Sequence, residues 1–231
     1  MSATARRTGI LGGRFDPVHR GHLAAAAVAR RLLHLDRVLM LPSRLSPHRR
    51  QPARAGGADR LAMVALAAQD DPSLEPCDLE LKADGPSYTA TTLRRLHEQG
   101  HPRTSLYFIV GADAFADIAC WHDYPRLLDA AHFVVVSRPG CPAASLADAL
   151  PAVRPRLRVV ANDTDPHAEG TLRTPVVFLI DGDTPDVSSS DIRTRLANGC
   201  PLEERVPAAV AAYIDRRRLY VRDPLARELH D

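Results

Sequence analysis

Short apolar runs alternate with longer amphipathic segments along most of this chain. The runs TGILGG at 8–13 and RVLMLP at 37–42 have strand length, and HLAAAAVARRLLHL at 22–35 between them consists of strong helix formers. A strand, a helix and a second strand within about 35 residues form a βαβ unit, which requires parallel strands. The start of the chain therefore predicts a parallel sheet.

The same alternation continues toward the other end. Further strands are expected at 79–82, 106–111, 132–140, 157–160 and 176–181. Further helices are expected at 59–69, 89–100, 188–199 and 207–220. The stretch 141–174 is rich in Pro, Ala and Arg, and apart from the short strand at 157–160 we interpret it as a surface insertion.

Strands that alternate with helices indicate an α/β fold, here a Rossmann-like, doubly wound parallel sheet with C-terminal helices. A chain of 231 residues is long enough for one substantial domain with its own core. We expect residues 1–185 to form the Rossmann-like domain and residues 186–231 to form a helical segment that completes the same domain.

Composition excludes several classes of protein. A hydrophobic content of 45% with 25% charged residues is typical of a folded globular chain, and a net charge of +2 is too small to indicate a nucleic-acid partner. We find no signal peptide, no apolar run of about 18 residues and no CxxC pair. We therefore expect a cytoplasmic protein that binds no membrane and no nucleic acid, and the oligomeric state stays open, a homo-oligomer included.

The basic residues consist almost entirely of arginine. Lysine and arginine together number 30, and Lys82 is the only lysine. Any site for an anion must therefore depend on arginine, histidine and backbone N–H groups, of which arginine grips phosphate with a planar fork.

Residues 12–22, GGRFDPVHRGH, follow the first predicted strand. Ligands of open parallel sheets bind beyond the carboxyl ends of the strands, and a glycine turn leading into a helix start offers free N–H groups to a phosphate. His19 and His22 lie three residues apart across that helix start, with Gly21 between them. The stretch fits neither GxGxxG nor GxxxxGK[ST], and a zinc site here would lack a third ligand. It predicts a phosphate site of another kind.

GGRFDPVHRGH resembles the GG(T/S)FDPxHxGH signature of the bacterial nicotinate-mononucleotide adenylyltransferases, which belong to the HxGH nucleotidyltransferase superfamily. The second mark of that superfamily, ISSTxIR, is similar to VSSSDIR at 187–193. Three segments typical of the family also have counterparts here: PPHK in SPHRR at 46–50, SYT in PSYTATTL at 86–93, and GxD…W in GADAFADIACWHDY at 111–124. The resemblance covers roughly four fifths of the chain, and the five landmarks together are specific.

The resemblance implies transfer of an adenylyl group from ATP to nicotinate mononucleotide, which gives nicotinate adenine dinucleotide and pyrophosphate, a step of NAD biosynthesis. It implies that His22 donates to the α-phosphate, that His19 contacts the phosphate chain, and that Arg193 grips the β and γ phosphates. Mg²⁺ would arrive with ATP, and no metal ligand from the protein is expected. The further residues that it assigns to ATP are Gly12, Gly13, Arg14, Phe15, Gly21, Gly111, Ser188, Ser189 and Ser190.

The resemblance also implies a pocket for the nicotinate nucleotide. The ring of Trp121 would stack on the nicotinate ring, Thr89 and the backbone N–H of His122 would bind its carboxylate, and Asp113 would hold the ribose. The residues assigned to this nucleotide are His48, Arg49, Tyr88, Thr89, Asp113, Trp121 and His122.

Two departures from the family pattern and several alternatives remain. Arg14 stands where relatives carry Thr or Ser, and it either adds a phosphate contact or crowds the site; Arg49 replaces a lysine.

The chain is alternatively an adenylyltransferase for nicotinamide mononucleotide or phosphopantetheine, or an inactive nucleotide-binding regulator. The arginine-rich runs at 43–54 and 154–158 suggest nucleic-acid binding as another alternative, but no aromatic residues are interleaved with the arginines to stack on bases.

Overall fold

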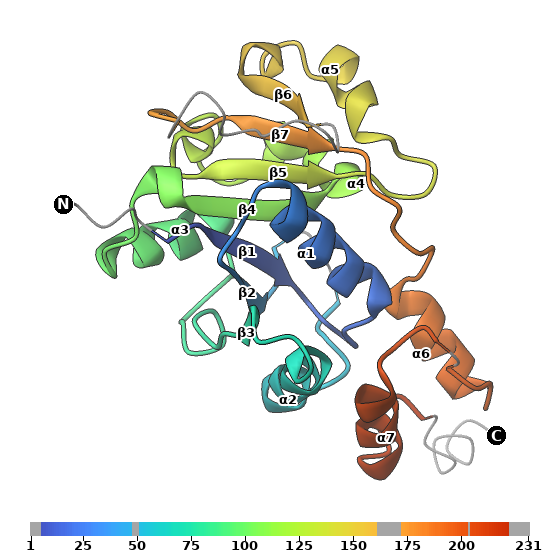
Figure 1. The fold of residues 1–231 in the computed structure, drawn as a ribbon. Helices are drawn as coiled ribbons and strands as arrows, with labels where there is room; N and C mark the ends of the chain where they lie inside the picture. The colour runs from blue at the N-terminus through green and yellow to red at the C-terminus, as the bar shows by residue number, and fades with distance from the viewer. Residues whose placement is uncertain (1–5, 48–50, 161–171, 203, 222–231) are drawn as a thin grey trace.

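The computed structural model describes residues 6–47, 51–160, 172–202 and 204–221. Its centre is a seven-stranded sheet in which every pairing is parallel and the strand order is β3-β2-β1-β4-β5-β7-β6 (Figure 1). The strands are β1 (Thr8–Gly13), β2 (Arg37–Pro42), β3 (Leu74–Pro76), β4 (Leu106–Gly111), β5 (His132–Val136), β6 (Leu157–Val160) and β7 (Val177–Ile180). The predicted α/β class is confirmed.

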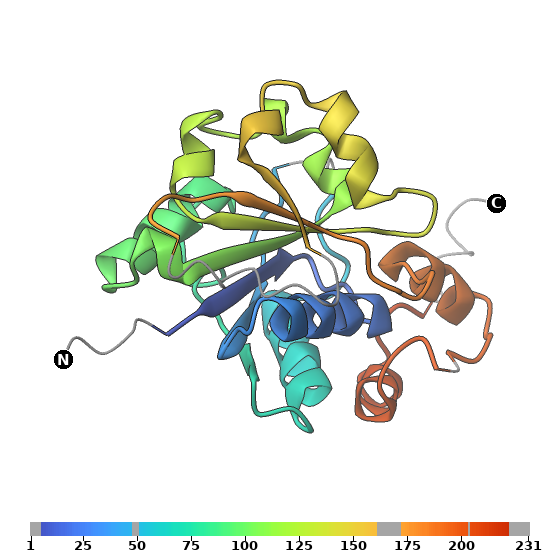
Figure 2. The ribbon, with the colours of Figure 1, turned by 45° about the horizontal axis from the view of Figure 1, so that its top comes forward.

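Helices cover both faces of the sheet. Figure 2 shows α1 and α2 on one face and α3, α4 and α5 on the other, with α6 and α7 beside the first group. The helices are α1 (Arg20–Leu32), α2 (Gly57–Ala68), α3 (Thr89–Glu98), α4 (Ala112–Phe115), α5 (Leu146–Ala149), α6 (Ser189–Ala197) and α7 (Ala208–Arg216). Each face has its own hydrophobic cluster, because side chains alternate between the two faces along each strand.

Two expectations about the elements are wrong. The alternation in LELK at 79–82 imitates a strand, but these residues form a turn in which the N–H of Lys82 donates to the carbonyl of Asp78, and the strand lies earlier, at Leu74–Pro76. The stretch 141–174 is more than a surface insertion around the predicted strand at 157–160, because Leu146 and Val153 are buried in the core. The strand itself is present as β6. Residues 161–171 lie outside the described part.

The strand order places a crevice at one edge of the sheet. From β1 the chain passes through α1 to β2 and then to β3 on one side, and it returns through α3 to β4 on the other side of β1. At such a switch point the two connections leave in opposite directions, and ligands bind in the gap beyond the carboxyl ends of the strands. The carboxyl ends of β1 and β4 are Gly13 and Gly111, two residues that the sequence predicts as ligand contacts.

Candidate active site

A cavity of about 600 Å³ opens at this edge of the sheet. Its walls come from the residues that follow β1, β2, β4 and β5, from the start of α3 and from the start of α6. The predicted residues that line it are Gly12, Gly13, Arg14, Phe15, His19, His22, Tyr88, Thr89, Gly111, Asp113, Trp121, His122, Ser188, Ser189, Ser190 and Arg193. The fold thus brings together segments that are up to about 180 residues apart in the sequence.

Of the predicted residues that the structure describes, Gly21 alone does not line the large cavity. Gly21 lies in the wall of a smaller cavity of about 30 Å³, which His22 and Gly111 also line. His48 and Arg49 lie outside the described residues, so their assignment stays a prediction.

The histidine pair stands where the chain enters α1. The rings of His19 and His22 stack with their centroids 3.7 Å apart, and the ring of Phe15 meets His22 edge-on at 4.9 Å. The backbone N–H of His19 donates to Nδ1 of His22 over 3.2 Å. A neutral His22 ring therefore carries its proton on Nε2, which makes Nε2–H a hydrogen-bond donor.

Both rings are held in the neutral form. Burial, with a smaller contribution from the charge of Arg138, lowers the pKa of His19 from 6.5 to about 3. Burial, His19 and Arg138 together lower the pKa of His22 well below its ordinary value. Nδ1 of His19 is buried and meets no hydrogen-bond partner among the described residues, which is uncommon for a buried polar atom. The pair therefore offers neutral N–H groups to a ligand.

The depressed pKa of His19 predicts acid sensitivity. The unfolded chain binds a proton on this residue below about pH 6.5, whereas the folded chain binds it only near pH 3, so stability falls as the pH drops through this window. We expect the free energy of unfolding to decrease between about pH 7.5 and about pH 5, and to decrease less in His19→Asn. Urea titrations at both pH values measure this; an equal decrease in both proteins would contradict it.

Close packing fixes the entry to α1. A Cβ atom at Gly21 would lie 3.1 Å from two atoms of the His19 ring and 3.5 Å from the carbonyl oxygen of Pro185, so this position has little room for a side chain. Phe15, which is buried, adopts a positive φ of 47°, a conformation that is rare outside glycine. The chain thus keeps a strained turn directly before the histidines.

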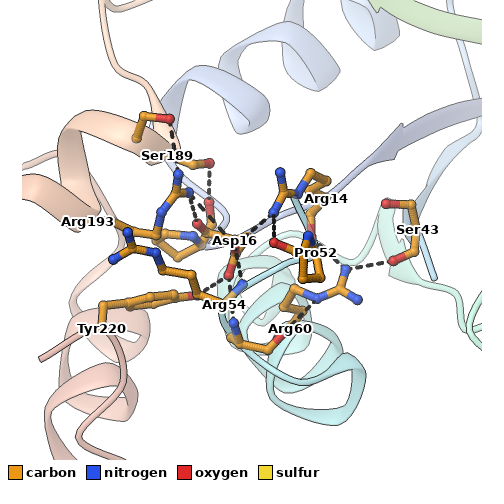
Figure 3. Close-up of polar contacts among 12 residues, drawn as sticks. Arg14, Asp16, Ser43, Pro52, Arg54, Arg60, Ser189, Arg193 and Tyr220 are labelled. Carbon is orange, nitrogen blue, oxygen red and sulfur yellow. Dashed lines mark hydrogen bonds and ion pairs between the residues drawn. The ribbon is translucent and has the colours of Figure 1, made fainter. Parts of the chain in front are cut away.

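The carboxylate of Asp16 is the centre of a cluster of polar contacts at the arginine-lined end of the cavity (Figure 3). It is buried, and its two oxygens accept hydrogen bonds from the backbone N–H groups of Arg54 and Ala55 and from the hydroxyl of Tyr220. The guanidinium groups of Arg14 and Arg193 lie 3.5 and 3.8 Å from its Oδ2 atom. A buried carboxylate requires such partners.

The arginines around Asp16 have different surroundings. Arg193 donates to the carbonyl oxygen of Asp16 at 2.6 Å and to Oγ of Ser190 at 3.1 Å. Arg14 donates to the carbonyl oxygen of Pro52 at 2.6 Å. Arg60 is buried and donates to carbonyl oxygens of the surrounding loops, so it fixes the backbone, whereas Arg14 and Arg193 line the cavity.

The start of α6 closes the cavity from the far side. Ser188 is the N-cap of α6, as expected for one of the three serines, and its Oγ accepts from the N–H of Asp191 at 3.0 Å. The hydroxyl of Ser189 donates to the carbonyl oxygen of Pro17 at 2.8 Å and so fixes α6 to the loop before α1. The contribution of Ser189 toward a ligand is therefore its backbone N–H in the first turn.

Aromatic side chains line the opposite end of the cavity. Trp121 is half-buried and meets Phe108 edge to face with a centroid distance of 6.2 Å. The rings of Tyr88 and His122 stack at 4.4 Å. Asp113 is exposed and forms an ion pair of 3.6 Å with Arg138. This end combines flat apolar surfaces with polar groups, as a site for a planar ring requires.

Sequence reasoning missed several side chains of the cavity wall, among them Arg138, Glu80 and Asp16. Arg138 follows β5 at the ligand-binding edge and contributes to the lowered pKa of both histidines. Burial raises the pKa of Glu80, whose carboxylate accepts from the hydroxyl of Thr92 at 2.7 Å. Asp16 stands inside the motif itself. The rule that residues following parallel strands form the site points to Arg138, whereas nothing in the local sequence points to Glu80.

The described ranges contain no group of three or more His, Cys, Asp and Glu side chains that is placed to hold a metal ion. In the same residues, no helix is both long and apolar enough to cross a membrane.

A parallel sheet with a basic, histidine-lined cavity at its carboxyl edge defines a nucleotide-binding α/β protein. A model of the cytidylyltransferase-like family matches residues 10–195, and the chain belongs to this family. This match and the relatives named as probable nicotinate-nucleotide adenylyltransferases together confirm the resemblance seen in the sequence.

Several relatives extend the comparison to nearly the full chain. A probable nicotinate-nucleotide adenylyltransferase of Roseiflexus castenholzii is 42% identical over 94% of this chain and 99% of its own. Another, of Citrifermentans bemidjiense, is 39% identical over 93% and 98%. Among solved structures, a Plasmodium falciparum nicotinic acid mononucleotide adenylyltransferase complexed with NaAD has the same fold, with a TM-score of 0.69, 17% identity and 93% and 97% coverage.

Proposed function

We propose that this protein is a nicotinate-nucleotide adenylyltransferase, which joins ATP and nicotinate mononucleotide to form nicotinate adenine dinucleotide and pyrophosphate. One observation carries the proposal: a single cavity contains a neutral histidine pair and two arginines at one end and Trp121, Tyr88 and His122 at the other. The names of relatives that are about 40% identical over nearly the whole chain support it.

The phosphate end supplies what the reaction needs. The 5′-phosphate of the mononucleotide attacks the α-phosphorus of ATP, the new P–O bond forms as the bond to the β-phosphate oxygen breaks, and pyrophosphate leaves. A phosphate monoester is already an anionic nucleophile, so the protein has to align two polyanions and offset their charge. Nε2–H of His22 is the donor to the α-phosphate, and His19 contacts the phosphate chain beside it.

The leaving pyrophosphate needs cations and N–H groups. Arg193 and Arg14 face the β and γ phosphates, and the first-turn N–H groups of Ser189 and Ser190 add neutral donors. Mg²⁺ bound with ATP offsets phosphate charge. The carboxylate of Asp16 already accepts three hydrogen bonds, so we assign Mg²⁺ to the phosphates and water and not to this carboxylate.

The aromatic end selects the second nucleotide. Trp121 stacks on the nicotinate ring, and Thr89 and the backbone N–H of His122 bind its carboxylate. Asp113, beside Arg138, holds the ribose. His48 and Arg49 are assigned to the same nucleotide. The domain limit at residue 185 stays a prediction, and the oligomeric state stays open, a homo-oligomer included.

The test is pyrophosphate release from Mg-ATP by the purified protein, with nicotinate mononucleotide and nicotinamide mononucleotide in parallel. We expect turnover with the acid form at a kcat/KM at least about tenfold above that with the amide, because donors placed for a carboxylate are left unpaired by an amide. Equal or higher kcat/KM with the amide would reassign the substrate. If neither mononucleotide supports pyrophosphate release while ATP still binds, the result would favour a nucleotide-binding regulator.

A further inference from the structure

Asp16 connects four segments that are distant in the sequence. Its Oδ1 accepts from the N–H of Ala55 at 3.0 Å and from the hydroxyl of Tyr220 at 2.9 Å, and its Oδ2 accepts from the N–H of Arg54 at 2.8 Å. Its backbone carbonyl accepts from Arg193. Tyr220 is 204 residues away and lies beyond the region that the family model matches.

The carboxylate also separates two like charges. Arg14 and Arg193 both approach Oδ2, at 3.5 and 3.8 Å, and both line the cavity (Figure 3). Without a negative charge between them the two guanidinium groups would repel each other, and this repulsion would oppose their placement side by side. Asp16 is therefore placed to hold both cations toward the same ligand.

Tyr220 in turn fixes the carboxylate. Tyr220 is 9% exposed, and burial followed by the charge of Asp16 raises the pKa of its hydroxyl far above the ordinary value. The hydroxyl therefore stays protonated at neutral pH and remains a hydrogen-bond donor. A hydrogen bond from a neutral donor to a buried carboxylate is stronger than one between neutral groups.

We infer that Asp16 and Tyr220 form a positioning pair for the phosphate site: Tyr220 orients the carboxylate, and the carboxylate orients Arg14 and Arg193 toward the phosphates of the bound nucleotide. The inference rests on the proposed function only in naming ATP as that nucleotide. Neither member of the pair touches the reacting atoms, so both act through the arginines.

The experiment uses Tyr220→Phe, which removes one hydroxyl and changes no charge. We expect the dissociation constant of ATP to rise about three- to tenfold and kcat/KM for ATP to fall about tenfold. These changes are somewhat smaller than the loss of one direct hydrogen bond to a charged group, because Tyr220 acts on ATP only through the arginines. Titration calorimetry with ATP alone gives the first value, and pyrophosphate release gives the second. Circular dichroism identifies the temperature at which every variant is fully folded.

Tyr213→Phe is the matched control. Tyr213 also donates to a carboxylate at 2.9 Å, that of Asp59, and it lies on α7, but neither residue lines the cavity. We expect the ATP affinity and activity of this variant to stay within about twofold of the wild type. The lost bond also joins a tyrosine hydroxyl to a carboxylate, but it lies outside the cavity. Equal losses in Tyr220→Phe and Tyr213→Phe would mean that Tyr220 only stabilises the fold, and would overturn the pair.

Asp16→Asn tests whether the two residues act as one unit. We expect it to lower kcat/KM for ATP more than Tyr220→Phe does, and we expect the double variant to be no worse than Asp16→Asn alone, because Tyr220 acts through that carboxylate. Fully additive effects would overturn the pair. If the wild type binds ATP but releases no pyrophosphate, the proposed function fails and the calorimetric comparison still decides on the pair.

Discussion

Substitution of His22 by alanine is expected to lower kcat about 10³-fold, the largest single loss among the residues of the site. The backbone N–H of His19 fixes the proton of His22 on Nε2, and burial keeps the ring neutral, so this side chain is a preorganised N–H donor. A donor that meets the α-phosphate only as charge develops there affects kcat more than the KM for ATP. Steady-state pyrophosphate release measures both.

The control for this substitution is His97→Ala. Nε2 of His97 is bonded to the carbonyl oxygen of Ala130 at 2.8 Å, and the residue does not line the cavity. Substitution of His97 should leave kcat within about twofold of the wild type, because neither this residue nor its hydrogen-bond partner Ala130 lines the cavity. A His22→Ala variant that is folded and retains more than about a tenth of the wild-type kcat would refute the role assigned to His22.

Arg193→Ala should lower kcat/KM for ATP by about 10² to 10³, the second largest effect. The guanidinium group donates to the carbonyl oxygen of Asp16 and to Ser190, and it lines the cavity at the end that we propose for the β and γ phosphates. Arg193→Lys keeps the charge but lacks the planar fork, so it should recover only part of the loss. Activity at a series of ATP concentrations distinguishes the three proteins.

Arg195→Ala is the matched control on the same helix. Arg195 donates to the carbonyl oxygen of Pro201 at 3.2 and 3.3 Å and does not line the cavity. Removal of either arginine changes the net charge by the same amount, so a general charge effect would lower the activity of both variants equally. Full activity of Arg193→Lys would show that a point charge suffices there.

Hydrophobic patterning predicted most of the fold because the central strands are buried on both faces. The runs at 8–13, 37–42 and 106–111 have the bounds of β1, β2 and β4. The same reasoning failed at 79–82, where Leu79 and Glu80 turn inward to pack and to bond Thr92 without forming a strand. A short edge strand such as β3 has too few residues for its pattern to stand out.

The motif predicted the histidines because both lie within a few residues of a strand end and a helix start, where local geometry decides their placement. It did not predict that Arg14 would turn toward Pro52 and Asp16, or that Tyr220 would reach the same carboxylate. Those contacts join segments tens to hundreds of residues apart, and only the folded backbone determines which of the many arginines meets which partner.

The exclusive use of arginine at the phosphate site has a practical consequence for chemical labelling. Lys82 carries the only lysine amine in the chain, pairs with Asp78 on the surface and has a side chain that is 75% exposed. An amine-reactive fluorophore or surface linker therefore has one side chain to modify, and that residue does not line the cavity. Apart from the α-amino group, a probe placed on Lys82 reports from a single known position while every cation around Asp16 keeps its charge.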